Sequence, residues 1–264
     1  MTTQDTPLSF WEHLDVLRGV LFRSALVSVV CAVVAFLFKD ELFAVVLAPK
    51  SSDFITYQWL GRLARLTGGE DMAAFSVSLV NTGLAQQFVI HMKTALAAGL
   101  LCASPYVVYQ LFGFIAPALY DNERRYAVGI VASSYVMFVV GLLLSYYLVF
   151  PLTFRFLGTY QVSQDVANMI TLESYMSTLA MMCLTLGVLF ELPVVAWLLG
   201  KMGIVRAPMM RRYRRHAIVV ILVVAAVITP TSDVFTLTVV SLPIWVLYEA
   251  SIWIVARCAW DERE

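Results

Sequence analysis

The sequence predicts an all-α polytopic membrane protein with six transmembrane helices. Of its 264 residues, 61% are hydrophobic and only 14% are charged, and the mean hydropathy is +0.81. A soluble domain of this length would be near half apolar and about a quarter charged. The apolar runs are long and continuous, whereas a transmembrane barrel shows weak alternating segments of roughly ten residues.

Six apolar segments predict the spans, because a helix needs about 20 mainly apolar residues to cross a bilayer. The fifth segment is short and would rise only about 20 Å, against a hydrocarbon core of roughly 30 Å. Flanking residues must then snorkel, or the bilayer must thin locally. We expect a single membrane domain over 1–264, with an outside loop over 39–93 and spans over 20–38, 94–116, 126–150, 172–199, 217–229 and 234–256.

The outside loop contains a predicted amphipathic helix. In DFITYQWLGRLARLTGG, Phe54, Trp59 and Leu60 recur at roughly helical spacing, with arginines interleaved and a glycine pair as a stop. Two interpretations are open. The helix lies in the membrane interface, or it packs on the protein as part of a soluble loop.

Basic residues in the short loops predict that both termini are cytoplasmic. The segment 151–171 contains only Arg155, and TPTSD contains no positive charge. On the other side, Arg124 and Arg125 follow the second span, and Arg18, Arg23, Arg257 and Arg263 lie near the termini. The loop between the fourth and fifth spans is richest, with Lys201, Arg206, Arg211, Arg212, Arg214 and Arg215.

Three prolines fall inside the predicted spans, at Pro105, Pro193 and Pro243. Each removes a backbone donor and is expected to kink or break its helix. The fifth and sixth spans are separated only by TPTSD and should form a short hairpin. We find no repeat between the two halves, which argues against a transporter fold.

One carboxylate, Glu191, lies within the fourth span in the stretch LGVLFELPVV. A charge at mid-bilayer costs roughly 2.5–3.5 kcal/mol on insertion scales. Two interpretations are open: a protonated carboxyl that makes one hydrogen bond to a neighbouring helix, or a polar patch that faces a water-filled concavity. Glu249, near the cytoplasmic end of the sixth span, is predicted to pair with a basic residue.

Other acids gather near the predicted cytoplasmic surface. Glu12 and Asp15 are three residues apart in SFWEHLDVLRGVLFRS and are neighbours on one helix face, where they could attract a cationic peptide. Asp121 and Glu123 in the DNERRY turn either serve such a role or are ordinary loop charges neutralised by the two arginines that follow.

The sequence lacks the motifs HExxH, GxSxG and GxGD, and its three histidines are isolated. Its four cysteines occur singly, without metal-ligand spacing. We therefore expect a protein that is not an enzyme and needs no cofactor or metal, with no cleavable signal peptide.

The motifs HLDVLR, SPYVVYQLFGFIAPALYDNERR, LGVLFELPVV, ITPTSDVF and LPIWVLYE together resemble the TatC family. That family provides the core membrane subunit of the twin-arginine protein translocase. The resemblance implies a concave, glove-like bundle of six helices with short fifth and sixth helices. It also implies recognition of twin-arginine signal peptides on folded precursors, and export across the cytoplasmic (inner) membrane driven by the proton-motive force. The implied partners are single-span TatA- and TatB-type subunits, further copies of the chain and the lipid bilayer, but no nucleic acid.

The resemblance also assigns roles to residues. Glu123 falls on the loop glutamate that helps to bind the arginine pair. Glu191 falls on the intramembrane acid, expected on the concave face as a contact for a partner. Asp233 and Pro49 fall on functional positions of the outer face. The expected signal-peptide site comprises Glu123, Phe114, Gln110, Asp15, Glu12 and Arg18.

Two features depart from the family pattern. The family usually has glutamate directly before Leu-Arg in its N-terminal motif, where this chain has Val16. We hypothesise that Asp15 or Glu12 substitutes for it. The outside loop is also longer than usual by about the stretch 51–72.

Two other functions are alternatives. One is a proton-coupled secondary carrier that uses Glu191 as its protonatable site. The other is a membrane scaffold that assembles other proteins without acting as a receptor.

Overall fold

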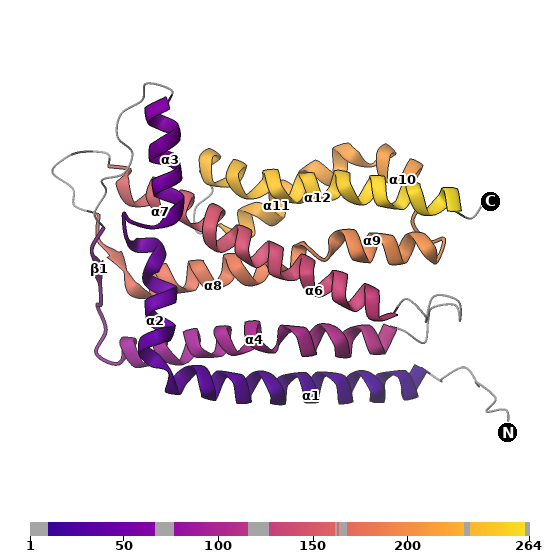
Figure 1. Ribbon diagram of the computed structural model, residues 1–264, viewed down its shortest axis with the longest axis horizontal. Coiled ribbons are helices and arrows are strands. Elements are labelled where there is room, and N and C mark those ends of the chain that lie inside the picture. Colours follow the sequence, from indigo (N-terminus) through magenta and orange to yellow (C-terminus); the bar gives the residue numbers. More distant parts are fainter. Residues whose placement is uncertain are drawn as a thin grey trace.

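A computed structural model describes residues 10–66, 77–115, 127–161, 163, 168–229 and 233–261 of the chain. It is a bundle of long helices (Figure 1), which confirms the predicted all-α polytopic class. Within these ranges, five helical segments are long and apolar enough to cross a membrane: Leu14–Leu37, Gln86–Phe114, Gly129–Thr159, Leu172–Lys201 and Val234–Arg257.

Helices α1 (Phe10–Leu37) and α4 (Gln86–Ile115) form one side of the bundle and pack along each other (Figure 1). Both begin before their predicted spans, because polar residues extend each helix past the apolar run. Large apolar side chains of α1 are exposed, including Leu21, Phe22 and Leu26 at 55%, 72% and 56%. An apolar surface of this kind is typical of a helix that faces lipid.

The third span is longer than predicted. Helix α6 (Ala127–Leu144) continues through a π-helical segment, η3 (Ser145–Val149), into α7 (Phe150–Thr159). Pro151, expected to follow the end of the span, lies in the first turn of α7. A proline can occupy that position because its missing N–H leaves only one helical carbonyl without a partner.

That carbonyl belongs to Tyr147, and a second element supplies its partner. The hydroxyl of Thr56 donates a hydrogen bond to the Tyr147 carbonyl. Thr56 lies in α3 (Ile55–Leu66), which follows α2 (Lys39–Leu47) and the 3-10 turn η1 (Ala48–Lys50). Helix α3 therefore caps the irregular stretch η3.

Tyr57 attaches the expected amphipathic helix to the rest of the protein. Its ring is fully buried, and its hydroxyl lies 3.0 Å from the Pro49 carbonyl and 3.1 Å from that of Pro151. Burial raises the pKa of Tyr57 above its ordinary value, so the phenol stays protonated and can donate. Helix α3 packs on the protein through this face, while Trp59 is 61% exposed.

The fourth span is divided into α8 (Leu172–Leu189) and α9 (Leu192–Lys201). The break coincides with Pro193, as predicted. A short parallel pair, β1 (Leu79–Val80) with β2 (Ile170–Thr171), precedes α4 and α8 and was not predicted.

Helix α11 (Arg214–Ile228) covers the expected short fifth span. With 15 residues it is not among the five segments long enough to cross a membrane. It follows α10 (Ala207–Arg212) and packs against α12 (Val234–Asp261) as the predicted hairpin. The expected shortening does not extend to α12, which has 28 residues. Pro243 lies inside α12, but the helix continues beyond it because its second half packs along α9.

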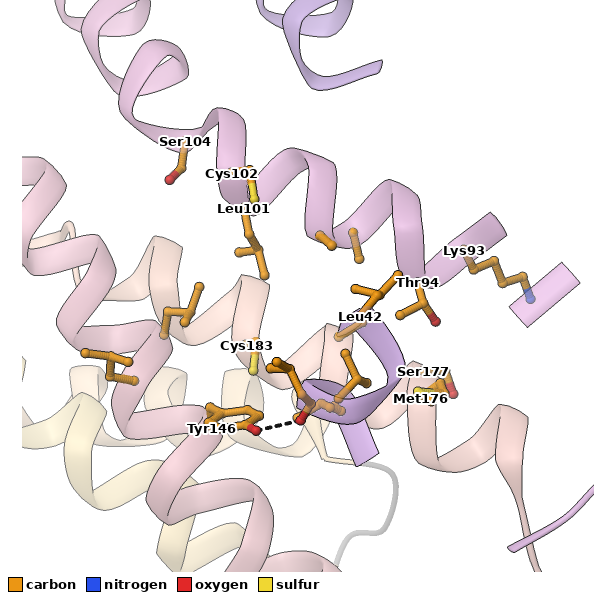
Figure 2. A pocket seen from close by; sticks show the side chains of 18 of the residues that line it. Leu42, Lys93, Thr94, Leu101, Cys102, Ser104, Tyr146, Met176, Ser177 and Cys183 are labelled. Atoms are coloured by element: carbon orange, nitrogen blue, oxygen red, sulfur yellow. Dashed lines mark hydrogen bonds between the residues drawn. The ribbon is translucent and has the colours of Figure 1, made fainter. Parts of the chain in front are cut away.

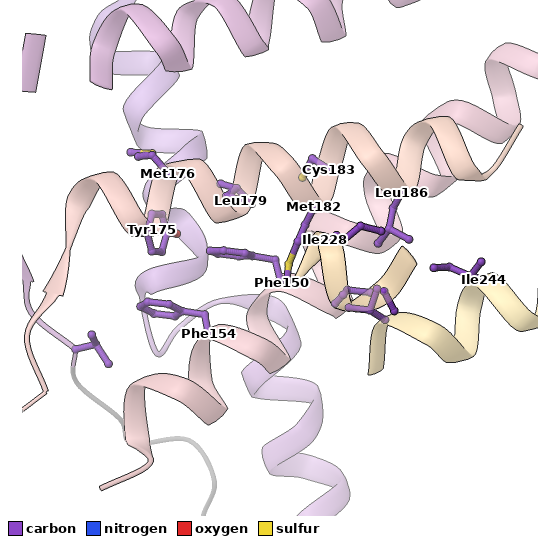
Figure 3. Packing of buried hydrophobic residues seen from close by; sticks show 14 of the residues in the cluster. Phe150, Phe154, Tyr175, Met176, Leu179, Met182, Cys183, Leu186, Ile228 and Ile244 are labelled. Carbon is purple, nitrogen blue, oxygen red and sulfur yellow. The ribbon is translucent and has the colours of Figure 1, made fainter. Parts of the chain in front are cut away.

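The main core lies where η3, α7, α8, α11 and α12 meet (Figure 3). Aromatic rings of Phe150, Phe154 and Tyr175 contact one another at centroid distances of 5.0–5.9 Å. Met182 and Leu186 of α8 extend the core toward α12 and are fully buried. This core fixes α8, and Glu191 follows the end of that helix.

Candidate functional site

Gly99 sets the distance between α1 and α4. A Cβ added at Gly99 would lie only 2.4 Å from the backbone nitrogen of Ala32, so no larger residue fits without separating the helices. Small residues allow such close approach between membrane helices. Because α1 and α4 run in opposite directions, the start of α1 lies beside the end of α4 (Figure 1).

This packing brings two predicted site regions to one end of the bundle. Counted from the Ala32–Gly99 contact, Asp15 lies about 26 Å along α1 and Phe114 about 22 Å along α4, at 1.5 Å per residue. Asp15 is exposed and Phe114 is half-buried. An acid and an aromatic side chain, nearly one hundred residues apart in sequence, therefore lie at the same level of the bundle.

The next turns of both helices carry two more predicted residues. Arg18 of α1 is exposed, one turn from Asp15. Gln110 of α4 is half-buried, and its amide donates a 2.5 Å hydrogen bond to the Tyr106 hydroxyl. Tyr106 thus orients Gln110, a contact that the sequence analysis missed although the two residues are one helical turn apart.

Two predicted residues cannot be placed by their side chains. Glu123 lies outside the described residues, between the end of α4 at Ile115 and the start of α6 at Ala127. Glu12 lies in α1, but its side chain is outside the described part.

Glu191 lies at the break between α8 and α9. Its backbone N–H donates to the Val188 carbonyl at 3.1 Å, and its carbonyl accepts from Val195 N–H at 2.9 Å. Pro193 supplies no N–H for the carbonyl four residues earlier, which ends the regular α8 pattern. The sequence therefore places an acid where the helix changes course.

A close contact between α6 and α8 gives Glu191 its partner. A Cβ at Gly141 of α6 would lie 2.7 Å from the Leu186 carbonyl of α8. Two turns earlier on α6, Ser134 donates a hydrogen bond from its hydroxyl to Glu191 Oε2. The other oxygen, Oε1, is buried and has no hydrogen-bond partner among the residues that the structure describes.

Glu191 thus makes the hydrogen bond to a neighbouring helix that the first interpretation expects. The second interpretation, a polar patch that faces a water-filled concavity, stays a prediction. Glu191 does not line the large cavity between α4 and α8, whose last contributor from α8 is Cys183, two turns earlier. That cavity is therefore separate from the intramembrane acid.

The predicted pairing of Glu249 is confirmed. Arg214 Nη2 of α11 lies 2.6 Å from Glu249 Oε2 of α12. The Tyr248 hydroxyl also donates to the Met210 carbonyl at 2.8 Å. These contacts connect the basic segment 201–215 to α12.

Pro49 and Asp233 both lie at the opposite end from the start of α1. Pro49 is fully buried, and its carbonyl lies 3.0 Å from the Tyr57 hydroxyl. Asp233 precedes α12, and its Oδ1 accepts a 2.8 Å bond from Thr236 N–H, the usual arrangement of a helix N-cap. In this structure both residues fix the ends of elements.

The sequence analysis also missed a polar group at that end. Lys93 Nζ donates to Glu173 Oε1 at 2.9 Å, and Gln86 Nε2 donates to Glu173 Oε2 at 2.7 Å. The three residues come from the starts of α4 and α8. No local sequence pattern links α4 to α8, so only the fold reveals the group.

The fold and these polar groups define the chain as a multi-pass helical membrane protein with a half-buried acid inside a candidate span. The family model for "Sec-independent protein translocase protein (TatC)" matches residues 12–243. The chain therefore belongs to the TatC family. Proteins of this family are components of the Sec-independent protein translocase.

Individual relatives agree with this assignment. The TatC protein of Deinococcus radiodurans is 34% identical over 242 residues, which cover 92% of this chain and 83% of the relative. The TatC protein of a Blattabacterium strain is 30% identical over 259 residues, which cover 96% of this chain and 97% of the relative. A crystal structure described as the twin-arginine translocase receptor TatC superposes with a TM-score of 0.76 at 29% identity, covering 94% of this chain and 99% of the other.

Proposed function

We propose that the chain is the receptor for twin-arginine signal peptides and the core of a translocase that exports folded proteins across the cytoplasmic membrane, driven by the proton-motive force. Membership of the TatC family and the likeness to a structure described as the receptor support this. The observation that carries it is the packing at Gly99 and Ala32, which brings the start of α1 beside the end of α4.

The proposed recognition rests on the chemistry of arginine. A guanidinium stays charged and forms paired hydrogen bonds to carboxylates. Glu123 follows α4, and Asp15 is exposed at the same end of the bundle. In this proposal the carboxylates of Glu123 and Asp15 bind the two adjacent guanidiniums. The side chains of Phe114 and Gln110 then border the bound peptide.

Because Val16 occupies the position of the usual glutamate, a second acid on α1 must take over its role in binding arginine. Asp15 is exposed on α1, which supports Asp15 as the substitute for the usual glutamate. Crosslinking of a signal peptide to variants Asp15→Ala and Glu12→Ala distinguishes the two acids. We expect Asp15→Ala to lose more crosslinking, and unchanged crosslinking in both variants would contradict the substitution.

We further propose that Glu191 is a contact for a polar group on a single-span TatA- or TatB-type partner. The buried oxygen Oε1 without a described partner supports this. A helix that supplies a donor would satisfy an atom whose desolvation otherwise costs about 1–3 kcal/mol.

We place both termini in the cytoplasm, in accord with the positive charges at the end where α1 starts.

Binding of a twin-arginine peptide to the purified chain in lipid nanodiscs tests the receptor function. We expect measurable binding by the chain alone, and at least tenfold weaker binding of a matched twin-lysine peptide. Equal binding of both peptides, or none of either, would favour the scaffold. Proton-coupled solute uptake by the chain alone in proteoliposomes would instead favour a carrier.

A further inference from the structure

A cavity of about 550 Å³ lies between α2, α4, α6 and α8 (Figure 2). Its walls are mainly apolar and include Leu42 of α2, Leu101 of α4 and Cys183 of α8. This volume is within the range of about 300–1,000 Å³ typical of ligand sites. The proposed receptor residues Asp15, Arg18, Gln110 and Phe114 do not line it.

The cavity is shorter than the thickness of a bilayer. On α4 its lining runs from Ile90 to Ser104, and this stretch rises about 21 Å. Lys93 and Ser104 lie at the two ends of the space in Figure 2. On α8 the lining runs from Glu173 to Cys183, or about 15 Å. A single leaflet contributes about half of the roughly 30 Å hydrocarbon core. A depth of about 15–21 Å holds the acyl chain of one leaflet, whereas a partner's spanning helix would need a groove of roughly 30 Å.

The cavity opens sideways at the surface of the bundle. Val45, Leu143 and Tyr147 all line it, and they are 59%, 44% and 44% exposed. A space that is lined by apolar groups and open to the lipid-facing surface is accessible to an acyl chain without passage through water.

The end of the cavity nearest the starts of α4 and α8 carries a positive and a negative group. Lys93 Nζ lies 2.9 Å from Glu173 Oε1. An ammonium has three donors, of which this bond uses one, and a carboxylate has acceptor positions beyond the two used here. The pair therefore complements a zwitterionic headgroup, with the lipid phosphate at Lys93 and the lipid ammonium at Glu173.

We propose that this cavity binds an acyl chain of one phosphatidylethanolamine-type phospholipid from the leaflet away from the start of α1. Its headgroup lies at the Lys93–Glu173 pair. The lipid fills the space between α4 and α8 and acts as part of the wall of the bundle.

A photoreactive lipid tests this proposal on the unaltered protein. Phosphatidylethanolamine with a diazirine at mid-chain is added to the purified protein in detergent and crosslinked, and the labelled peptides are identified by mass spectrometry. We expect labelling of α4 between Lys93 and Ser104 and of α8 between Glu173 and Cys183. Excess unlabelled phosphatidylethanolamine should lower it at least tenfold, and the same excess of anionic phosphatidylglycerol less than twofold.

A matched pair of variants tests the location. Ala98 lines the cavity and is half-buried, so Ala98→Trp should fill it and lower labelling at least tenfold. Leu96 lies on the same helix, is 56% exposed and is outside the lining, so Leu96→Trp should label like the unaltered protein. The competition experiment decides the matter even where a variant does not fold.

Three results would overturn the proposal. The first is labelling spread evenly over the lipid-facing surface of the bundle. The second is equal competition by both lipids, which would remove the zwitterionic headgroup. The third is displacement of the lipid by an equimolar amount of a single-span helical peptide, with no recovery of labelling when excess lipid is added. That result would assign the cavity to a helix.

Discussion

At the scale of single residues, Glu191 shows how this chain carries an acid within a membrane span. Ser134 satisfies one carboxyl oxygen from α6, and the break before α9 frees the side chain from a regular helical position. The remaining oxygen, Oε1, is buried. Among the described residues, Ser134 bonds to only one of the two carboxyl oxygens, and we therefore propose that Glu191 makes a second contact with a partner.

Replacing Glu191 should separate stability from transport. We expect Glu191→Leu to leave the melting temperature in detergent unchanged or raised, because an apolar group of similar size removes an unsatisfied buried oxygen. Export of a twin-arginine precursor should fall severely. Met181→Leu, at an exposed position of α8, is the control and should change neither. Loss of folding in Glu191→Leu would show that the acid is structural.

Tyr57 offers a second test at this scale. The change Tyr57→Phe keeps the buried ring but removes the hydroxyl that lies near the carbonyls of Pro49 and Pro151. Leaving a buried acceptor unsatisfied costs about 1–3 kcal/mol, so the melting temperature should fall. Tyr160→Phe, at a 62% exposed position, should have little effect. Equal melting temperatures for both variants would mean that the hydroxyl does not hold α3 in place.

At the scale of helices, close approach of neighbouring elements positions the polar groups. Gly99 allows α1 to meet α4, and Gly141 allows α6 to meet α8. Both contacts use a residue without a side chain, as is common between membrane helices. Farther along, Arg214 and Glu249 join α11 to α12, but they are partly exposed and contribute at most about 1 kcal/mol.

Gly141 can be tested against another glycine of the same helix. We expect Gly141→Ala to destabilise the protein by about 1–3 kcal/mol, because the new Cβ overpacks the contact with α8. At Gly129 an added Cβ meets nothing within 4 Å, so Gly129→Ala should be neutral or slightly stabilising. Thermal unfolding in detergent compares the two variants. A smaller loss for Gly141→Ala than for Gly129→Ala would contradict the packing described.

The helices themselves could be predicted from the sequence, but their irregularities could be predicted only in part. Long apolar runs define α1, α4 and α12, and Pro193 correctly marks the break before α9. The third span continues past its expected end at residue 150, because the carbonyl that Pro151 leaves free finds a donor in Thr56, 91 positions away along the chain. Such a rescue depends on tertiary contact and leaves no local signal.

At the scale of the whole molecule, the two ends of the bundle differ in chemistry. The start of α1, the ends of α4 and α12 and the basic helix α10 lie at one end (Figure 1). Tyr57, Pro49 and the Lys93–Glu173 pair lie at the other. By the charge rule for short loops, we propose that the first end faces the cytoplasm.

Cysteine labelling tests this orientation. In a variant without the native cysteines, Leu84→Cys, two residues before α4, should react with an impermeant maleimide in intact cells. Tyr213→Cys, between α10 and α11, should react only after the membrane is permeabilised. Both positions are exposed, at 108% and 51%. The reverse labelling pattern would place the termini outside.

The site could be predicted less completely than the fold. The charge and spacing of Glu12 and Asp15 suggested a cation-binding face, and the motifs resembling the TatC family supplied Glu123, Gln110 and Phe114. Lys93 and Glu173 escaped notice because each is an ordinary charged residue in its own sequence context. Their pairing and the cavity behind them exist only once α4 and α8 are packed together.

The most direct test of the central claim is a double-mutant cycle between Glu123 and the first arginine of a twin-arginine peptide. Binding is measured in nanodiscs for the unaltered chain and Glu123→Ala, each with the arginine peptide and with an arginine-to-alanine peptide. Hydrogen bonds to charged groups contribute about 1.5–3 kcal/mol. We therefore predict about 10–100-fold weaker binding for Glu123→Ala with the melting temperature unchanged, and little further loss when both partners are altered. Losses that simply add would contradict a direct contact between Glu123 and the arginine.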